Sequence, residues 1–157
     1  EITTRLVGSE MCIRDRDKLP KIANLFNRDG GPEPPVGISV PQAMYDDFVK
    51  ISEPIQKIRP DYPFEVKVRE PRKRPTRMGG TDASVFAIEG VPTLGFTTED
   101  FKGYDFDYGE IWHTERDLYT KNIPEYQEHT ATVTAIIALG VANLDKQLSR
   151  EGLYTEE

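Results

Sequence analysis

The sequence predicts an α/β domain with a mixed sheet, because two kinds of apolar pattern alternate along the chain. Short, nearly continuous apolar runs are typical of buried strands, and apolar residues at every third or fourth position are typical of helices. Turns rich in glycine and proline separate these segments. The 157 residues are enough for one domain with a core of its own, and no internal repeat is visible.

Composition excludes several classes of protein. Twenty Lys and Arg residues against 27 Asp and Glu residues leave a net charge of −7. A general nucleic-acid binder is therefore not expected, because binding phosphates requires a cationic surface. No apolar stretch approaches the ~18 residues of a membrane span. The single cysteine, Cys12, excludes an internal disulfide framework.

Residues 1–16 are expected to be foreign to the protein. They show neither a hydrophobic period nor the core of a signal peptide. They resemble a translated transposon-type sequencing adapter, because residues 6–15 can be written as codons that spell such an adapter in one frame. The native part would then begin near Asp17, and the segment is left out of the fold prediction.

The first two native segments are predicted to be a strand and a helix. Residues 22–27 form a short apolar run that ends before Asp29 and two glycines, as a buried strand running into a loop would. Apolar residues at spacings of three and four predict a helix over residues 40–58, with Ser39 as its N-cap. Pro54 should kink or restart that helix.

The middle of the chain alternates again. Residues 64–68 have the two-residue period of a half-exposed strand, and residues 69–77 form a basic, proline-containing loop. A short helix is predicted from 83 to 89, capped by Thr81 or Asp82 and ended by Gly90. Residues 91–96 are predicted to be a second buried strand.

The last third is predicted to hold a loop and a long helix. Residues 97–108 are acidic and aromatic, which is typical of a loop. Apolar residues from Val133 to Leu148 form the inner stripe of a helix that should run from about 125 to 148. The tail, residues 149–157, is expected to be frayed.

Two histidines are the candidates for chemistry. His129 is interpreted as a surface or capping residue at the start of the last helix. His113 is either a structural histidine or a metal ligand, with Asp117 four residues further on. Asp29 is either a turn residue or a ligand at the end of a strand. Two donors cannot make a catalytic zinc site, which needs about three, so the chain would hold only part of one.

Four motifs in this order and spacing resemble the carboxyl-terminal part of peptidase family M28, which contains zinc aminopeptidases and carboxypeptidase Q. The resemblance extends from residue 21 to about residue 148. The motifs are Arg-Asp-Gly-Gly at 28–31, Gly-Gly-Thr-Asp at 79–82, Glu-Gly-Val-Pro-Thr-Leu-Gly-Phe at 89–96 and Ile-Trp-His-Thr-x-x-Asp at 111–117.

The resemblance implies an α/β/α zinc-exopeptidase fold of the phosphorylase/hydrolase type, present here without its N-terminal half. It implies two zinc ions in the full-length parent, with Asp29 and His113 as ligands and Asp82 and Asp117 in supporting roles. The family's His-x-Asp and Glu-Glu motifs, which supply the other ligands and the general base, are absent. No catalytic residue is therefore assigned, and residues 17–148 are expected to be an inactive part of the catalytic domain.

The expected function of the parent is hydrolysis of peptide substrates, as an aminopeptidase or a dipeptidase. One alternative is a non-catalytic binding domain with the same fold, and another is an unrelated α/β domain with a structural His113. The basic loop at 69–77 is either solvated or receives a peptide carboxylate. The aromatic residues before His113 form either packing or a specificity pocket. Family habit points to a secreted or periplasmic protein, and the oligomeric state is left open.

Overall fold

The computed structural model describes residues 17–155, so the predicted adapter-derived segment 1–16 lies outside the described residues. A three-stranded mixed sheet forms the centre, with strand order β2-β1-β3. Strand β1 (Pro35–Val40) pairs in parallel with β2 (Glu65–Val68) and antiparallel with β3 (Phe96–Thr98). The prediction of a mixed α/β fold is therefore confirmed.

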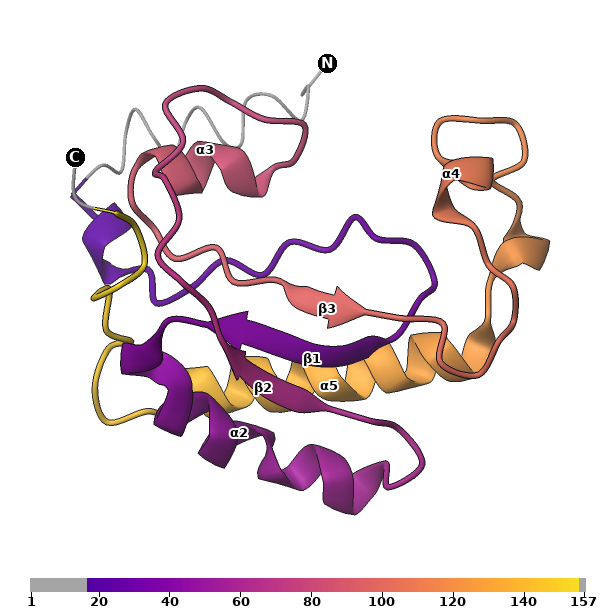
Figure 1. Cartoon of the computed structure of the whole chain (residues 1–157), viewed down its shortest axis with the longest axis horizontal. Coiled ribbons are helices and arrows are strands. Elements are labelled where there is room, and N and C mark those ends of the chain that lie inside the picture. The colour runs from indigo at the N-terminus through magenta and orange to yellow at the C-terminus, as the bar shows by residue number, and fades with distance from the viewer. Residues whose placement is uncertain (1–16, 156–157) are drawn as a thin grey trace.

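Two long helices, α2 (Tyr45–Ile58) and α5 (Pro124–Ala142), pack against each other and against the sheet, as Figure 1 shows. Ile38 and Val40 are both fully buried, because alternate residues of a strand point to the same face. The main core forms between this face and the helices. Its buried members are Ile38, Val40, Met44, Phe48, Ile51, Ile55, Leu94, Val133, Ile137, Leu148 and Leu153.

The start of the helix predicted over residues 40–58 is wrong. Ser39 and Val40 belong to strand β1, and a 3-10 turn (Gln42–Met44) leads from this strand into α2. Val40 and Met44 are four residues apart and both are buried, which is the spacing expected of a helix. They belong to two different elements that contribute to the same core. Pro54 lies inside α2, which continues to Ile58.

The two predicted apolar strands on either side of this unit are also corrected. Residues 22–27 have no regular secondary structure, and of the run 91–96 only Phe96 belongs to a strand, β3. The two segments nevertheless lie side by side. The Leu25 amide donates to the Pro92 carbonyl at 2.9 Å, and the Leu94 amide donates to the Asn24 side chain at 2.9 Å.

Two short helices adjoin the predicted motifs. Helix α3 (Ala83–Ile88) lies within the predicted range 83–89, and Gly90, whose φ of +76° favours glycine, follows its end. The predicted cap is not formed, because the side chain of the N-cap residue Asp82 makes no capping hydrogen bond. Helix α4 (Tyr108–Ile111) lies on an arm between β3 and α5, away from the sheet (Figure 1). Further 3-10 turns lie at Leu19–Lys21 and Tyr119–Lys121. No helix within residues 17–155 is both long and apolar enough to cross a membrane.

The described part of the tail packs onto the domain, in contrast to the expected fraying. Helix α5 ends at Ala142 rather than at Leu148, and Leu153 is buried. The guanidinium of Arg150 donates to the carbonyl oxygens of Leu19, Pro20, Ile22 and Gly90. The tail therefore ties the start of the described chain to the end of α3.

His129 is buried, so its interpretation as a surface or capping residue is wrong. Its Nε2 lies 3.0 Å from the Pro35 carbonyl oxygen and must donate, since a carbonyl only accepts. The ring stacks on Tyr62 at 4.0 Å between centroids, and Nδ1 has no partner among the described residues. Burial lowers the pKa of His129, and the nearby cations Arg59 and Lys102 act in the same direction.

We expect the free energy of unfolding to fall as the pH is lowered from about 7 towards 5. Below the ordinary histidine pKa of about 6.5, the unfolded chain binds a proton at His129 more readily than the folded chain does, because folding lowers the pKa of His129. Urea unfolding across this range measures the slope, which should be smaller in His129→Gln. His113→Ala is the control, since it leaves His129 in place. A His129→Gln slope equal to that of the unaltered chain would contradict this assignment.

Candidate functional site

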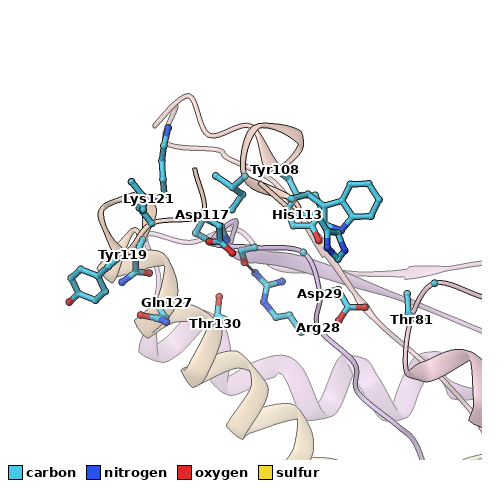
Figure 2. Close-up of a pocket in the computed structure, with 18 of the residues that line it drawn as sticks. Arg28, Asp29, Thr81, Tyr108, His113, Asp117, Tyr119, Lys121, Gln127 and Thr130 are labelled. Carbon is cyan, nitrogen blue, oxygen red and sulfur yellow. Dashed lines mark hydrogen bonds between the residues drawn. The ribbon is translucent and has the colours of Figure 1, made fainter. Parts of the chain in front are cut away.

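All four residues predicted for the site line one hollow of about 1150 Å³: Asp29, Asp82, His113 and Asp117. Figure 2 shows that Asp29 and His113 approach this hollow from different segments. Asp29 lies in the coil before β1, whereas His113 follows α4. The fold thus brings a carboxylate and an imidazole from distant parts of the sequence to the same hollow.

Hydrogen bonds hold the loop that carries Asp29. The Asn27 side-chain amide donates to Asp29 Oδ2 at 2.7 Å. The Arg28 guanidinium donates to the carbonyl oxygens of Gly31, at 2.8 Å, and of Glu33. Burial lowers the pKa of Arg28, because the charged guanidinium loses hydration. Arg28 therefore closes the loop across its base and leaves Asp29 exposed at its tip.

The turn after α4 presents His113 in a left-handed conformation, with φ of +55°. Such a conformation is uncommon outside glycine and is concentrated at functional sites. The Thr114 hydroxyl donates to the Glu110 carbonyl at 2.9 Å, and the His113 ring meets the Trp112 ring edge-on at 4.8 Å. The His-Thr pair thereby ends the helix and leaves the imidazole exposed on the wall of the hollow.

Asp117 and Asp82 line the same hollow as His113. The Asp117 amide donates to the Thr114 carbonyl at 3.3 Å, which closes the next turn. Within residues 17–155, no hydrogen bond joins the Asp117 carboxylate to the His113 ring. Asp82 precedes α3 and makes no side-chain cap hydrogen bond. The supporting roles of these two carboxylates stay predictions.

Several lining residues escaped the sequence prediction. Arg28 and Lys121 add positive charge, and Gln127 and Thr130 add polar groups from the first turns of α5. The Lys121 ammonium lies 3.0 Å from Glu110 Oε2, and this hydrogen bond lowers the pKa of Glu110. The three-residue spacing of Gln127 and Thr130, which places both on one side of a helix, was the signal that could have found them.

The donor set for a metal is incomplete in the described part of the chain. No group of three His, Cys, Asp or Glu side chains that could hold a metal ion occurs within residues 17–155. A catalytic zinc takes about three protein ligands and keeps one open position. Asp29 and His113 have the right chemistry to be donors, but these residues alone do not fit a complete zinc site.

A second hollow of about 560 Å³ adjoins the first, and Asp29 lies on the wall of both. Arg72 and Lys73 from the predicted basic loop line this second hollow, as does Phe96 of β3. The sequence prediction left the role of the basic loop open, and the structure places two of its cations within reach of the Asp29 loop.

The comparison with known proteins identifies the family. No curated protein and no solved structure gives a significant match. The sequence model described as peptidase family M28 matches residues 4–137, which is most of the chain. The matched range includes residues 4–16, and their origin in an adapter stays a prediction. Together with the site that joins the Arg-Asp-Gly-Gly and His-Thr-x-x-Asp motifs, this match shows that the chain belongs to peptidase family M28, a family of hydrolases that act on peptides.

Proposed function

We propose that this chain supplies Asp29 and His113 to the two-zinc centre of an exopeptidase, and that the remaining donors and the general base lie outside residues 17–155. The observation that carries the proposal is the shared hollow: a carboxylate and an imidazole, the donor types that zinc takes, are exposed on its wall. Membership of family M28 supports the same assignment, because this family is generally zinc-dependent.

Each residue has a distinct task in this proposal. When bound, a pair of zinc ions would supply a hydroxide nucleophile and would polarise the carbonyl of the scissile bond. Asp29 offers a carboxylate oxygen whose orientation is held by the Asn27 amide. His113 offers a ring nitrogen from a turn that Thr114 closes. Since no general base is assigned within residues 17–155, we expect the chain by itself to hydrolyse no peptides.

Zinc titration followed by proton NMR of the histidine rings tests this proposal. The chain has only two histidines, and His129 is buried, so the two rings serve as a responsive and a silent probe. Zinc should shift or broaden the His113 signals and leave those of His129 unchanged. Asp29→Asn should weaken the zinc response at His113 by about tenfold or more, since loss of even an outer partner costs 10–100-fold.

Asp46→Asn, a change on the distant helix α2, is the matched control and should titrate like the unaltered chain. Zinc titration curves for Asp29→Asn that superimpose on those of the unaltered chain would contradict convergence on one centre. Hydrolysis of a peptide by the metal-free chain would exclude the zinc mechanism. Peptide binding without any zinc response would favour the alternative of a non-catalytic binding domain.

A further inference from the structure

The second hollow shares Arg28, Asp29, Gly30 and Thr81 with the first, so the two hollows meet at the Asp29 loop. We propose that this second hollow is a subsite for the free carboxylate of an apolar residue at the carboxyl end of a peptide, with Arg72 and Lys73 as its cations. The placement of the scissile bond beside Asp29 rests on the proposed function, whereas the recognition of the carboxylate does not.

Charge on the described walls distinguishes the two hollows. The first has three carboxylates, from Asp29, Asp82 and Asp117, against two basic side chains. The second has Asp29 as its one acidic residue among the described lining, against Arg28, Arg72 and Lys73. Since Arg28 donates to the Gly31 and Glu33 carbonyls, the cations left for a ligand are Arg72 and Lys73.

Arg72 is held in place while part of its guanidinium stays open. One terminal nitrogen donates to Thr93 Oγ1 at 2.6 Å and to the Thr93 carbonyl at 3.3 Å. The guanidinium carbon lies 5.8 Å from the centre of the Tyr154 ring, and the Arg72 backbone bonds to the packed tail. Its other guanidinium N–H groups donate to no residue within 17–155. A planar guanidinium that is fixed in this way suits a carboxylate.

Lys73 has no ion-pair partner within residues 17–155 and is exposed. An ammonium on a flexible stem adds a second positive charge without demanding one geometry. Apolar groups complete the walls, so the residue that bears the carboxylate should be apolar. These groups come from Leu25, Pro75, Ala83, Ala87, Leu94 and Phe96.

The geometry sets the direction in which a peptide would lie. With Asp29 at the junction, the segment on the amino side of the scissile bond occupies the larger hollow, which carries the acidic residues. The residue on the carboxyl side enters the second hollow and meets Arg72 and Lys73. Opposite charge on the two sides thus matches the two ends of a short peptide with free termini.

Binding of N-acetyl-L-leucine and N-acetyl-L-leucinamide to the metal-free chain tests the subsite, because the two probes differ only in the carboxylate. Isothermal titration calorimetry or NMR should show that the acid binds about tenfold more tightly than the amide, as one charge-assisted hydrogen bond provides. Lys73→Gln should reduce the affinity for the acid severalfold and leave that for the amide unchanged. Lys57→Gln, an exposed lysine at the end of α2, is the matched control.

Equal affinities for acid and amide would overturn the proposal, as would equal behaviour of Lys73→Gln and Lys57→Gln. Lys73 is exposed and has no ion-pair partner within residues 17–155, so its variant remains informative if Arg72→Gln fails to fold. The probes bind without zinc, and failure of the subsite is therefore distinct from failure of the proposed function. Selective binding of the acid without a zinc response at His113 would support the carboxylate subsite and contradict the proposed metal centre.

Discussion

Phe48→Ala is expected to lower the free energy of unfolding by about 3–5 kcal/mol, the largest effect predicted for any single change in this chain. Phe48 is fully buried on α2 and belongs to the core cluster that includes Ile38 of β1 and Ile137 of α5. Truncation removes most of the aromatic side chain and leaves a cavity where the helices meet the sheet. The surrounding backbone cannot collapse far into it, because both helices are long and regular.

Urea unfolding followed by circular dichroism measures this loss. Val49→Ala is the matched control, because Val49 is the next residue of the same helix and is 39% exposed. It should change the free energy of unfolding by no more than about 0.5 kcal/mol. Similar losses for the two variants would show that α2 does not present Phe48 to a packed core.

Gly37→Ala is expected to cost about 3 kcal/mol, at the upper end of the range for overpacking. Gly37 lies in the central strand β1, opposite Glu65 of β2. A β-carbon at position 37 would lie 2.4 Å from the Glu65 carbonyl oxygen. That atom belongs to the paired backbone, so relief of the clash requires the two strands to separate.

Gly95→Ala is the control for the Gly37 variant, because a β-carbon at position 95 meets no heavy atom within 4 Å. Thermal unfolding should therefore show a large fall in melting temperature for Gly37→Ala and little change for Gly95→Ala. Equal melting temperatures for Gly37→Ala and the unaltered chain would show that β1 and β2 are not paired in this register.

The candidate site was predictable because its residues belong to short motifs. Asp29, Asp82, His113 and Asp117 were chosen from motif order and spacing, and all four line one hollow. Their function as ligands or supporting groups is not decided by that placement. Lys121 was not found in this way, since a lone basic residue in a loop carries no local signal. Arg28 belongs to the Arg-Asp-Gly-Gly motif, but nothing in that motif assigned its side chain to the wall of the hollow. Lys121 reaches the wall only through the tertiary structure, which places the segment before α5 beside the hollow that Asp29 also lines.

The two strand predictions for residues 22–27 and 91–96 were wrong because an apolar run was taken as evidence that the segment pairs with a neighbouring strand. Residues 22–27 are apolar but have no regular structure, and the run at 91–96 contributes only Phe96 to β3. An apolar run shows that a segment is buried, whereas a strand also needs a neighbour with matching backbone groups. The opposite error occurred at Val40, a strand residue that was predicted to be helical. Val40 ends β1 and Met44 belongs to the following 3-10 turn, so a spacing of four between two buried residues did not indicate a helix.

The sequence by itself determined the mixed α/β class, the two long helices and the motifs that meet at the hollow. These features depend on residues close to one another in the chain, because helical periodicity and turn chemistry are local. Only the tertiary structure decided that β1 is the central strand, that His129 is buried against Pro35 and Tyr62, and that Arg150 ties the tail to the domain. Each of these joins residues distant in sequence, and such partners are set by the packing of the whole core.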